Sequence, residues 1–157
     1  MIEPGTTPPG FALIDLEGRV HRSEESRASS LLVFFKQGCA TCELSLPLFA
    51  TLGSRLPGLD LLGICQEDSE EAAALARRLG LSFPVAPDPE PHPVSRSFEL
   101  EYVPSWFALS AGEVLACGEG WSRQEFEELA HRLADSLGGV DSELRLDLEG
   151  VPDWRPG

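Results

Sequence analysis

The chain has 157 residues, of which 42% are hydrophobic and 24% are charged. This composition suits one globular domain of ordinary size. The net charge of −14 argues against binding to nucleic acid, which needs a basic patch, and against adsorption to an anionic membrane surface. Four cysteines are too few for a disulfide scaffold, so a chemical function becomes the better explanation for them.

The first residues, MIEPGTTPPGFALIDLEG, lack a basic segment followed by an apolar segment. They therefore predict no secretory signal. No apolar run in the chain approaches the ~18 residues that a membrane-spanning helix needs. From these two observations we expect a cytoplasmic protein.

The first half of the chain predicts a hairpin and then a strand–helix–strand unit. Residues 11–16 and 19–21 flank Glu17-Gly18, which is typical of a small hairpin turn. Residues 31–35 (LLVFF) form an apolar run that is typical of a strand buried on both faces. Apolar residues then follow at helical spacing, with Pro47 inside the helix, where we expect a kink. Residues 59–65 (LDLLGIC) predict the next buried strand.

The second half begins with a helix start at Asp68, because Glu71 three residues later completes a capping box. Gly80 predicts the end of that helix. A second capping box, Ser122 with Glu125, starts the clearest amphipathic helix, which Gly138-Gly139 ends. Between the two helices we expect short strands and one short helix; the strands are at 83–86, 103–109 and 113–117, and the helix is at 94–101.

This order of elements predicts an α/β protein with a mixed sheet. Two crossover units imply a parallel core, and the late hairpin adds antiparallel strands. We expect a single domain over residues 1–138. The remaining residues, 139–157, show weak alternation and are expected to be a tail that is either loosely attached or packed on the domain.

Cys39 and Cys42, in KQGCATCELSLP, follow the first buried strand directly and open a helix. A zinc site usually shows a second close pair of ligands, whereas Cys65 and Cys117 are single and lie in apolar strands. An inert disulfide across so short a loop gains little entropy from closure. We therefore favour a reversible dithiol over a structural disulfide or a metal site, which both remain alternatives.

A helix start stabilises negative charge on a thiolate. Cys39, the outer cysteine, is therefore the predicted nucleophile, and Cys42, one turn inside, is the residue that resolves a mixed disulfide. Lys36, the only lysine in the chain, is a candidate source of positive field. Cys65 ends a predicted parallel strand and is a candidate third thiol, with a buried inert cysteine as the commoner alternative.

Together these motifs resemble the thioredoxin superfamily. They are the CxxC after a buried strand, Pro47 five residues later, Val103-Pro104 before a late strand, and a capped last helix. The opening PPGFALIDLEGRV makes the chain more similar to the redoxin branch, which includes TlpA/ResA-type oxidoreductases and AhpC/TSA peroxiredoxins. The resemblance implies a three-layer α/β/α sandwich with an N-terminal β-hairpin extension.

The resemblance also implies that Pro104 is a cis proline facing the CxxC and that the backbone of Val103 pairs with a substrate segment. The chain departs from the pattern at three places. Ala40-Thr41 replaces the usual proline-containing dipeptide, so Thr41 is a candidate modulator of the redox potential, and Gly38 stands where many members have tryptophan. Val33 replaces the buried aspartate that assists proton transfer in thioredoxins.

The predicted function is thiol–disulfide exchange through Cys39 and Cys42. It needs no cofactor, and it needs two partners: a disulfide-bearing protein or small molecule, and a reductant or oxidant. One alternative is a peroxiredoxin-like peroxidase, although neither cysteine has the Pro-x-x-x-Thr/Ser-x-x-Cys pattern. A second alternative is a copper carrier on the same scaffold, for which His92 is the loop candidate.

Overall fold

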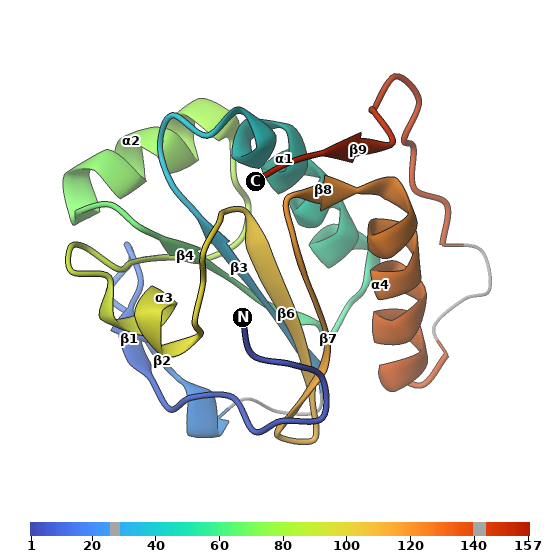
Figure 1. Ribbon diagram of the computed structural model, residues 1–157, viewed down its shortest axis with the longest axis horizontal. Helices are drawn as coiled ribbons and strands as arrows, with labels where there is room; N and C mark the ends of the chain where they lie inside the picture. Colours follow the sequence, from blue (N-terminus) through green and yellow to red (C-terminus); the bar gives the residue numbers. More distant parts are fainter. Residues whose placement is uncertain (26–28, 140–143) are drawn as a thin grey trace.

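The centre of the molecule is a five-stranded mixed sheet (Figure 1). The structure is a computed structural model that describes residues 1–25, 29–139 and 144–157. The strand order is β5-β4-β3-β6-β7. The strands are β3 (Ser29–Phe35), β4 (Asp60–Cys65), β5 (Val85–Pro87), β6 (Ser105–Ser110) and β7 (Glu113–Glu119). β3, β4 and β5 are parallel to one another, β6 pairs antiparallel with β3, and β7 pairs antiparallel with β6. This confirms the predicted mixed sheet.

Helices begin where the capping patterns predict. They are α1 (Ala40–Arg55), α2 (Ser69–Leu79), α3 (Pro93–Ser97) and α4 (Arg123–Ser136), and a 3-10 turn covers Ser23–Glu25. The Asp68 carboxylate accepts a hydrogen bond from the Glu71 N–H at 2.9 Å, which satisfies a free amide of the first turn of α2. The Ser122 hydroxyl accepts a hydrogen bond from the Glu125 N–H at the start of α4. Gly80 ends α2 in the left-handed conformation.

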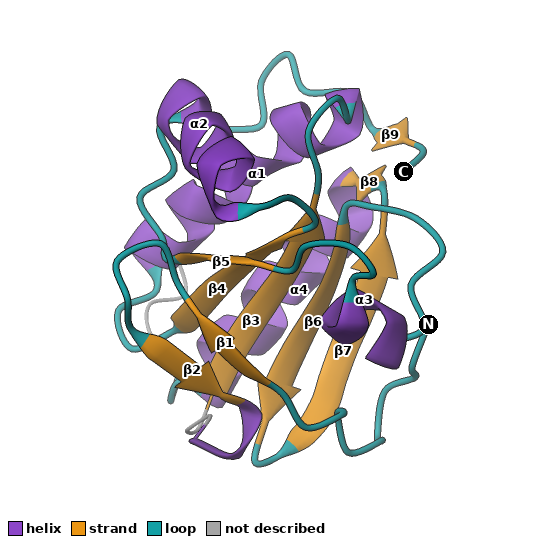
Figure 2. Cartoon of the chain, turned by 90° about the vertical axis from the view of Figure 1, so that its left-hand side faces the viewer, coloured by secondary structure: helices purple, strands orange, loops and turns teal. Residues whose placement is uncertain are grey.

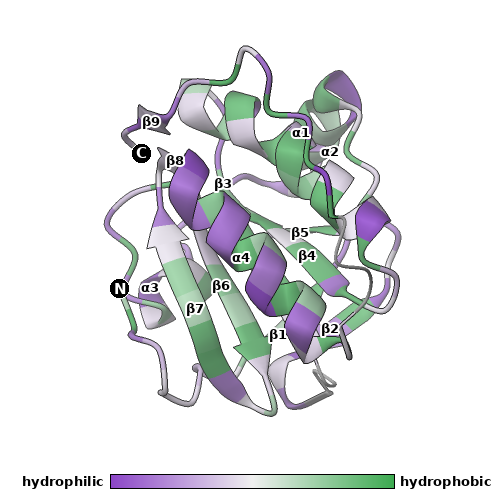
Figure 3. Cartoon of the chain, turned by 90° about the vertical axis from the view of Figure 1, so that its right-hand side faces the viewer, coloured by the Kyte–Doolittle hydropathy of each residue, from purple (hydrophilic) through white to green (hydrophobic). Residues whose placement is uncertain are grey.

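Helices and a hairpin cover the two faces of the sheet. α1 and α4 lie on one face (Figure 3), and α3 lies on the other with the hairpin of β1 (Ala12–Ile14) and β2 (Val20–Arg22) (Figure 2). α2 packs against β5 and α1. This arrangement confirms the α/β/α sandwich and the N-terminal hairpin expected from the sequence.

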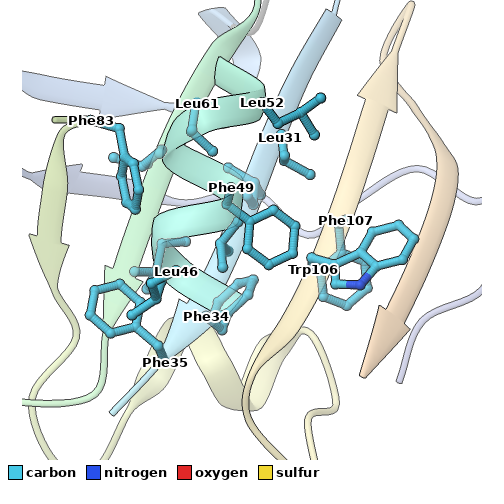
Figure 4. Close-up of a cluster of buried hydrophobic side chains, with 14 of the residues drawn as sticks. Leu31, Phe34, Phe35, Leu46, Phe49, Leu52, Leu61, Phe83, Trp106 and Phe107 are labelled. Atoms are coloured by element: carbon cyan, nitrogen blue, oxygen red, sulfur yellow. The ribbon is translucent and has the colours of Figure 1, made fainter. Parts of the chain in front are cut away.

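The core fills both sides of β3, whose seven residues are all buried. On one side, Phe49 of α1 packs edge-on against Phe126 of α4 at 5.4 Å between ring centres. On the other side, Phe34 of β3 packs against Phe98 at 5.1 Å. Figure 4 shows Phe49 and its helix neighbours lying against β3. A strand buried on both faces explains why residues 31–35 are a continuous apolar run rather than an alternating one.

Three details differ from the expected elements. α3 is shorter than the predicted helix at 94–101, because Glu99 takes a left-handed conformation that α-helix does not allow. Strand β6 begins at Ser105, so Val103 and Pro104 lie just before it. Short strands β8 (Trp121–Ser122) and β9 (Trp154–Arg155) pair antiparallel, although nothing in the sequence pattern predicts them. Within the described ranges, no helix is long and apolar enough to cross a membrane.

Residues 144–157 run over the domain surface, and we call this segment the strap. Leu148 is buried, whereas Leu144 and Leu146 of the predicted alternation are only partly buried. Part of the expected tail, residues 140–143, lies outside the described residues. The β8–β9 pairing brings the end of the strap to the top of α1 (Figure 1).

Candidate functional site

Cys39 and Cys42 lie at the start of α1, directly beyond the end of β3. Cys39 is the N-cap residue, and its sulfur accepts a hydrogen bond from the Cys42 N–H at 3.1 Å. The two sulfurs are within bonding distance, with the Cα atoms 5.2 Å apart. Cys39 is 8% exposed and Cys42 is 1% exposed, so Cys39 is the more accessible residue of the pair.

The helix start gives Cys39 a favourable place for a negative charge. Its sulfur is held at the end of α1 where amide N–H groups are free and the positive end of the helix dipole lies. The one acidic residue in the first turn, Glu43, forms an ion pair with Arg78 of α2 at 2.8 Å. The hydrogen bond from Arg78 lowers the pKa of Glu43, so Arg78 partly neutralises the carboxylate in the first turn of α1.

The Val103 carbonyl stands on the other side of Cys39. The Cys39 sulfur is 3.4 Å from the Val103 oxygen, and the Val103–Pro104 peptide bond is cis. Both residues are buried, and Ser105 behind them donates to the Tyr102 carbonyl at 2.7 Å. The sulfur therefore lies between a helix N-terminus and the Val103 carbonyl of the segment that precedes β6.

A cleft of about 340 Å³ opens over Cys39. Three parts of the chain line it: residues 36 and 38–41 of the dithiol loop, residues 66 and 100–103 of neighbouring loops, and residues 156–157 of the strap. Of the residues predicted from sequence, this brings together Lys36, Cys39, Thr41 and Val103. Pro104 lies behind Val103 and does not line the cleft.

Cys65 is separate from this cleft, although it ends the strand next to β3. Its partner across the sheet is Phe35, and its side chain is fully buried. Burial, with a smaller contribution from the Glu67 carboxylate, raises the pKa of the Cys65 thiol to about 12. A thiol so placed stays protonated at neutral pH, so it does not supply a third thiolate to the cleft.

Two further sequence candidates also lie away from the cleft. The sulfur of Cys117 in β7 lies 3.5 Å from the Ile2 carbonyl oxygen, and burial raises the pKa of the Cys117 thiol. The Nδ1 atom of His92 lies 2.7 Å from the Asp88 carbonyl, in the proline-rich loop that precedes α3. Across the described residues, no group of three or more His, Cys, Asp and Glu side chains is arranged to hold a metal ion.

Sequence reasoning missed the strap and the loop residues that complete the cleft. The Thr41 hydroxyl donates to the Pro156 carbonyl at 2.6 Å, which joins the dithiol loop to the strap. Glu67 accepts a hydrogen bond from the Gln37 N–H at 2.9 Å and so ties the loop to the segment after β4. These contacts join residues 115 and 30 positions apart, and contacts at such separations leave no periodic signal in a sequence.

Comparison with known sequences places these motifs in a family. The profile of the AhpC/TSA family matches residues 4–115. The thiol-disulfide oxidoreductase ResA of Geobacillus thermodenitrificans is 33% identical over 88 residues, which cover 54% of this chain and 51% of that protein. ResA of Geobacillus kaustophilus is 29% identical over 115 residues, covering 70% of this chain and 66% of that protein. The match thus spans between half and two thirds of these relatives.

Solved structures share the fold at low sequence identity. The thioredoxin domain of a thiol-disulfide oxidoreductase from Bacteroides vulgatus superposes with a TM-score of 0.74 at 15% identity, covering 85% of this chain and 99% of that one. A secreted Mycobacterium tuberculosis disulfide oxidoreductase gives a TM-score of 0.68 at 17% identity, covering 80% and 95%. The fold is therefore thioredoxin-like, as the sequence motifs imply.

Proposed function

Since the chain belongs to the AhpC/TSA family, we propose that it is a thiol–disulfide oxidoreductase that works through Cys39 and Cys42. The observation that carries the proposal is the position of the Cys39 sulfur. It is the accessible member of a bonded pair, it caps a helix, and it opens into a cleft next to the Val103 carbonyl. The names of the ResA relatives point to the same chemistry.

In the reducing direction, the Cys39 thiolate attacks one sulfur of a substrate disulfide. An S–S bond forms between Cys39 and that sulfur, the substrate S–S bond breaks, and the other substrate sulfur leaves as a thiolate that takes a proton. Cys42 then loses its proton and attacks the Cys39 sulfur, which releases the second substrate thiol. Two electrons have moved from the dithiol to the substrate. A dithiol reductant restores the pair, and the same steps run in reverse oxidise a substrate dithiol.

The surroundings of the pair assign a task to each cysteine. The exposed fraction of Cys39 and its place as helix cap suit the attacking thiolate. The buried sulfur of Cys42 is protected from solvent reactants, so its nearest electrophile is the mixed disulfide on Cys39. Val33 lies in the buried centre of β3, so the proton of Cys42 leaves without a carboxylate at that position.

Val103 is the proposed docking point for the substrate backbone. Its carbonyl oxygen lies 3.4 Å from the Cys39 sulfur, so an extended segment that pairs with Val103 brings its own sulfur beside the nucleophile. The partners are a disulfide-bearing protein or small molecule and a separate electron donor or acceptor. Lys36 lines the same cleft and adds positive charge next to the thiolate.

Titration of the Cys39/Cys42 couple against a redox buffer tests the proposal. The protein is equilibrated at a series of thiol-to-disulfide ratios, quenched with acid and alkylated, and the fraction of oxidised pair is counted by mass spectrometry. A single two-electron transition is expected, and Cys39→Ser removes it. A pair that stays wholly oxidised or wholly reduced over the physiological range of potentials would rule out reversible exchange.

A further inference from the structure

The strap is held to the domain by side chains from both helices that flank it. At one end, Arg55 of α1 donates to the Arg145 carbonyl at 2.9 Å. In its middle, Arg123 of α4 donates to the Leu148 carbonyl at 3.0 Å and to the Val151 carbonyl. These donors make hydrogen bonds to backbone carbonyls of the strap, and Leu148 of the strap is buried in the core.

The Arg123 side chain also forms an ion pair with Asp153 at 2.9 Å. Next to it, the Trp121 indole donates to the Pro152 carbonyl at 2.7 Å, and Trp121 is 2% exposed. Strand β9 then pairs with β8. Arg123 thus contacts the strap at Leu148, Val151 and Asp153, and it does not line the cleft over Cys39.

The end of the strap reaches the dithiol. Pro156 accepts the hydrogen bond of Thr41, one residue before Cys42. Gly120 allows this close approach, because a Cβ atom there would lie 2.7 Å from the Arg155 carbonyl oxygen. A Cβ on Gly157 would lie 3.1 Å from the Val103 oxygen. The strap therefore occupies the space beside the Val103 backbone, where the substrate segment is proposed to pair.

We propose that residues 153–157 of the strap are a specificity element that limits the dithiol to low-molecular-weight disulfides. This inference rests on the proposed exchange activity. The cleft left beside the strap, about 340 Å³, is at the small end of the range for small-molecule sites. A folded protein needs a wider surface around its disulfide, and the strap covers part of that surface.

A folded substrate reaches Cys39 only after the end of the strap moves away. That movement breaks the bond from Thr41 to Pro156 and the β8–β9 pairing, and the Arg123 contacts oppose it. A small disulfide needs only the cleft that is present with the strap in place. Weakening the strap should therefore accelerate exchange with a folded protein and leave exchange with a small disulfide unchanged.

The test compares second-order rate constants of the reduced full chain with two probes, insulin and the neutral 2-hydroxyethyl disulfide. The quantity of interest is the ratio of the insulin rate to the small-disulfide rate, because it cancels changes in the reactivity of Cys39 itself. Arg123→Ala should raise this ratio about tenfold, because the loss of one or two net hydrogen bonds makes opening of the strap about tenfold more favourable. Arg132→Ala removes an exposed arginine from the same helix and serves as the matched control; its ratio should stay at the wild-type value.

Thr41→Val is the second variant, since it keeps the shape of the side chain and removes the donor to Pro156. Hydrogen exchange of the strap amides is measured in the same samples. The proposal predicts that the ratio rises in step with loss of amide protection, and most in the double variant. A ratio that stays constant while protection is lost would overturn it, as would a strap that stays fully protected in the double variant.

Two different results would show that the specificity proposal is wrong and that the proposed activity is wrong. If the wild-type protein exchanges with neither probe, the proposed oxidoreductase function is wrong. If it exchanges with the small disulfide and the ratio does not respond to strap release, the activity stands and the strap has no part in substrate choice.

Discussion

Cys39 and Cys65 are two cysteines near the carboxyl ends of neighbouring parallel strands, β3 and β4, and the structure gives them different surroundings. Cys65 is the last residue of β4, fully buried, with its pKa raised to about 12. Cys39 comes a few residues after β3, where the chain has left the sheet and begins a helix. Its sulfur accepts an amide hydrogen bond and faces a cleft.

Both strands are followed by a helix, so the difference lies in where each cysteine stands between strand and helix. Cys39 is itself the N-cap of α1, whose free amides stabilise a thiolate. Asp68 is the N-cap of α2, and Cys65 remains in the sheet, where burial favours the neutral thiol.

The reactivity of the two thiols should differ most. In the fully reduced protein at pH 7, iodoacetamide should modify Cys39 at least about a thousandfold faster than Cys65, because a thiol with a pKa near 12 carries almost no thiolate at that pH. Peptide mapping by mass spectrometry over time measures both rates in one sample. Unfolding in urea should bring the two rates close together, and similar rates in the folded protein would contradict the contrast.

Removing the buried partner of the pair should separate the two steps of exchange. Cys42→Ser should still form a mixed disulfide on Cys39 but should lower turnover by about a hundredfold or more, since no neighbouring thiol resolves it. The adduct is observed as a mass increase that dithiothreitol reverses. Cys65→Ser is the control, and the hypothesis fails if that variant loses turnover while Cys42→Ser keeps it.

The Cys65 thiol should make the fold less stable in alkali. Its pKa is near 12 when folded and near 9 when unfolded, so between these values the unfolded state loses the proton and the folded state keeps it. Its contribution to stability is therefore complete below about pH 9 and falls as pH rises towards 12.

The measurement compares the free energy of unfolding in urea at pH 8.5 and pH 10.5, with Cys39 and Cys42 replaced by serine to prevent disulfide exchange. Between these two pH values, the free energy of unfolding should fall by about 2 kcal/mol more in the protein with Cys65 than in Cys65→Ala. Equal pH dependence with and without Cys65 would show that its thiol is less buried than the structure indicates. Cys117→Ala, which removes the half-buried thiol of β7, provides the comparison.

The smallest effect is expected from Lys36. Its side chain is exposed at the rim of the cleft, so Lys36→Gln should slow exchange only about twofold. The rate of exchange with a small disulfide, measured at low and high salt, checks this. Added salt should remove the difference from wild type, and a large loss of rate that persists in salt would mean that Lys36 touches the thiolate directly.

Much of the framework is already present in local patterns. The apolar run at 31–35 reads as a two-sided buried strand, the capping residues Asp68 and Ser122 mark helix starts, and Cys39 with Cys42 falls at the junction of strand and helix. Each pattern works because it depends on neighbours within a few residues: hydrogen bonds to the first helical turn and side chains on successive positions of one element.

The rest of the candidate site depends on contacts between distant residues. Thr41 stands in the dipeptide between the cysteines, and its hydrogen bond to Pro156 crosses 115 positions of sequence. Residues 100–102, which line the cleft, follow α3 and carry no motif of their own. The strap shows only weak alternation, although Leu148 is buried, because hydrogen bonds from Arg55, Trp121 and Arg123 to its backbone carbonyls also hold it.

By itself, then, the sequence determined the order of the elements, the mixed sheet and the placement of the Cys39–Cys42 pair at a helix start, since these follow from hydrogen bonds and periodicity within short segments. The tertiary structure places Cys65 in the core and Cys39 at a cleft. Burial raises the pKa of Cys65, and the end of the strap lines the cleft beside Cys39. Both depend on the solvent exposure of a sulfur atom and on the segments that pack beside it, and only the packing of distant segments determines these.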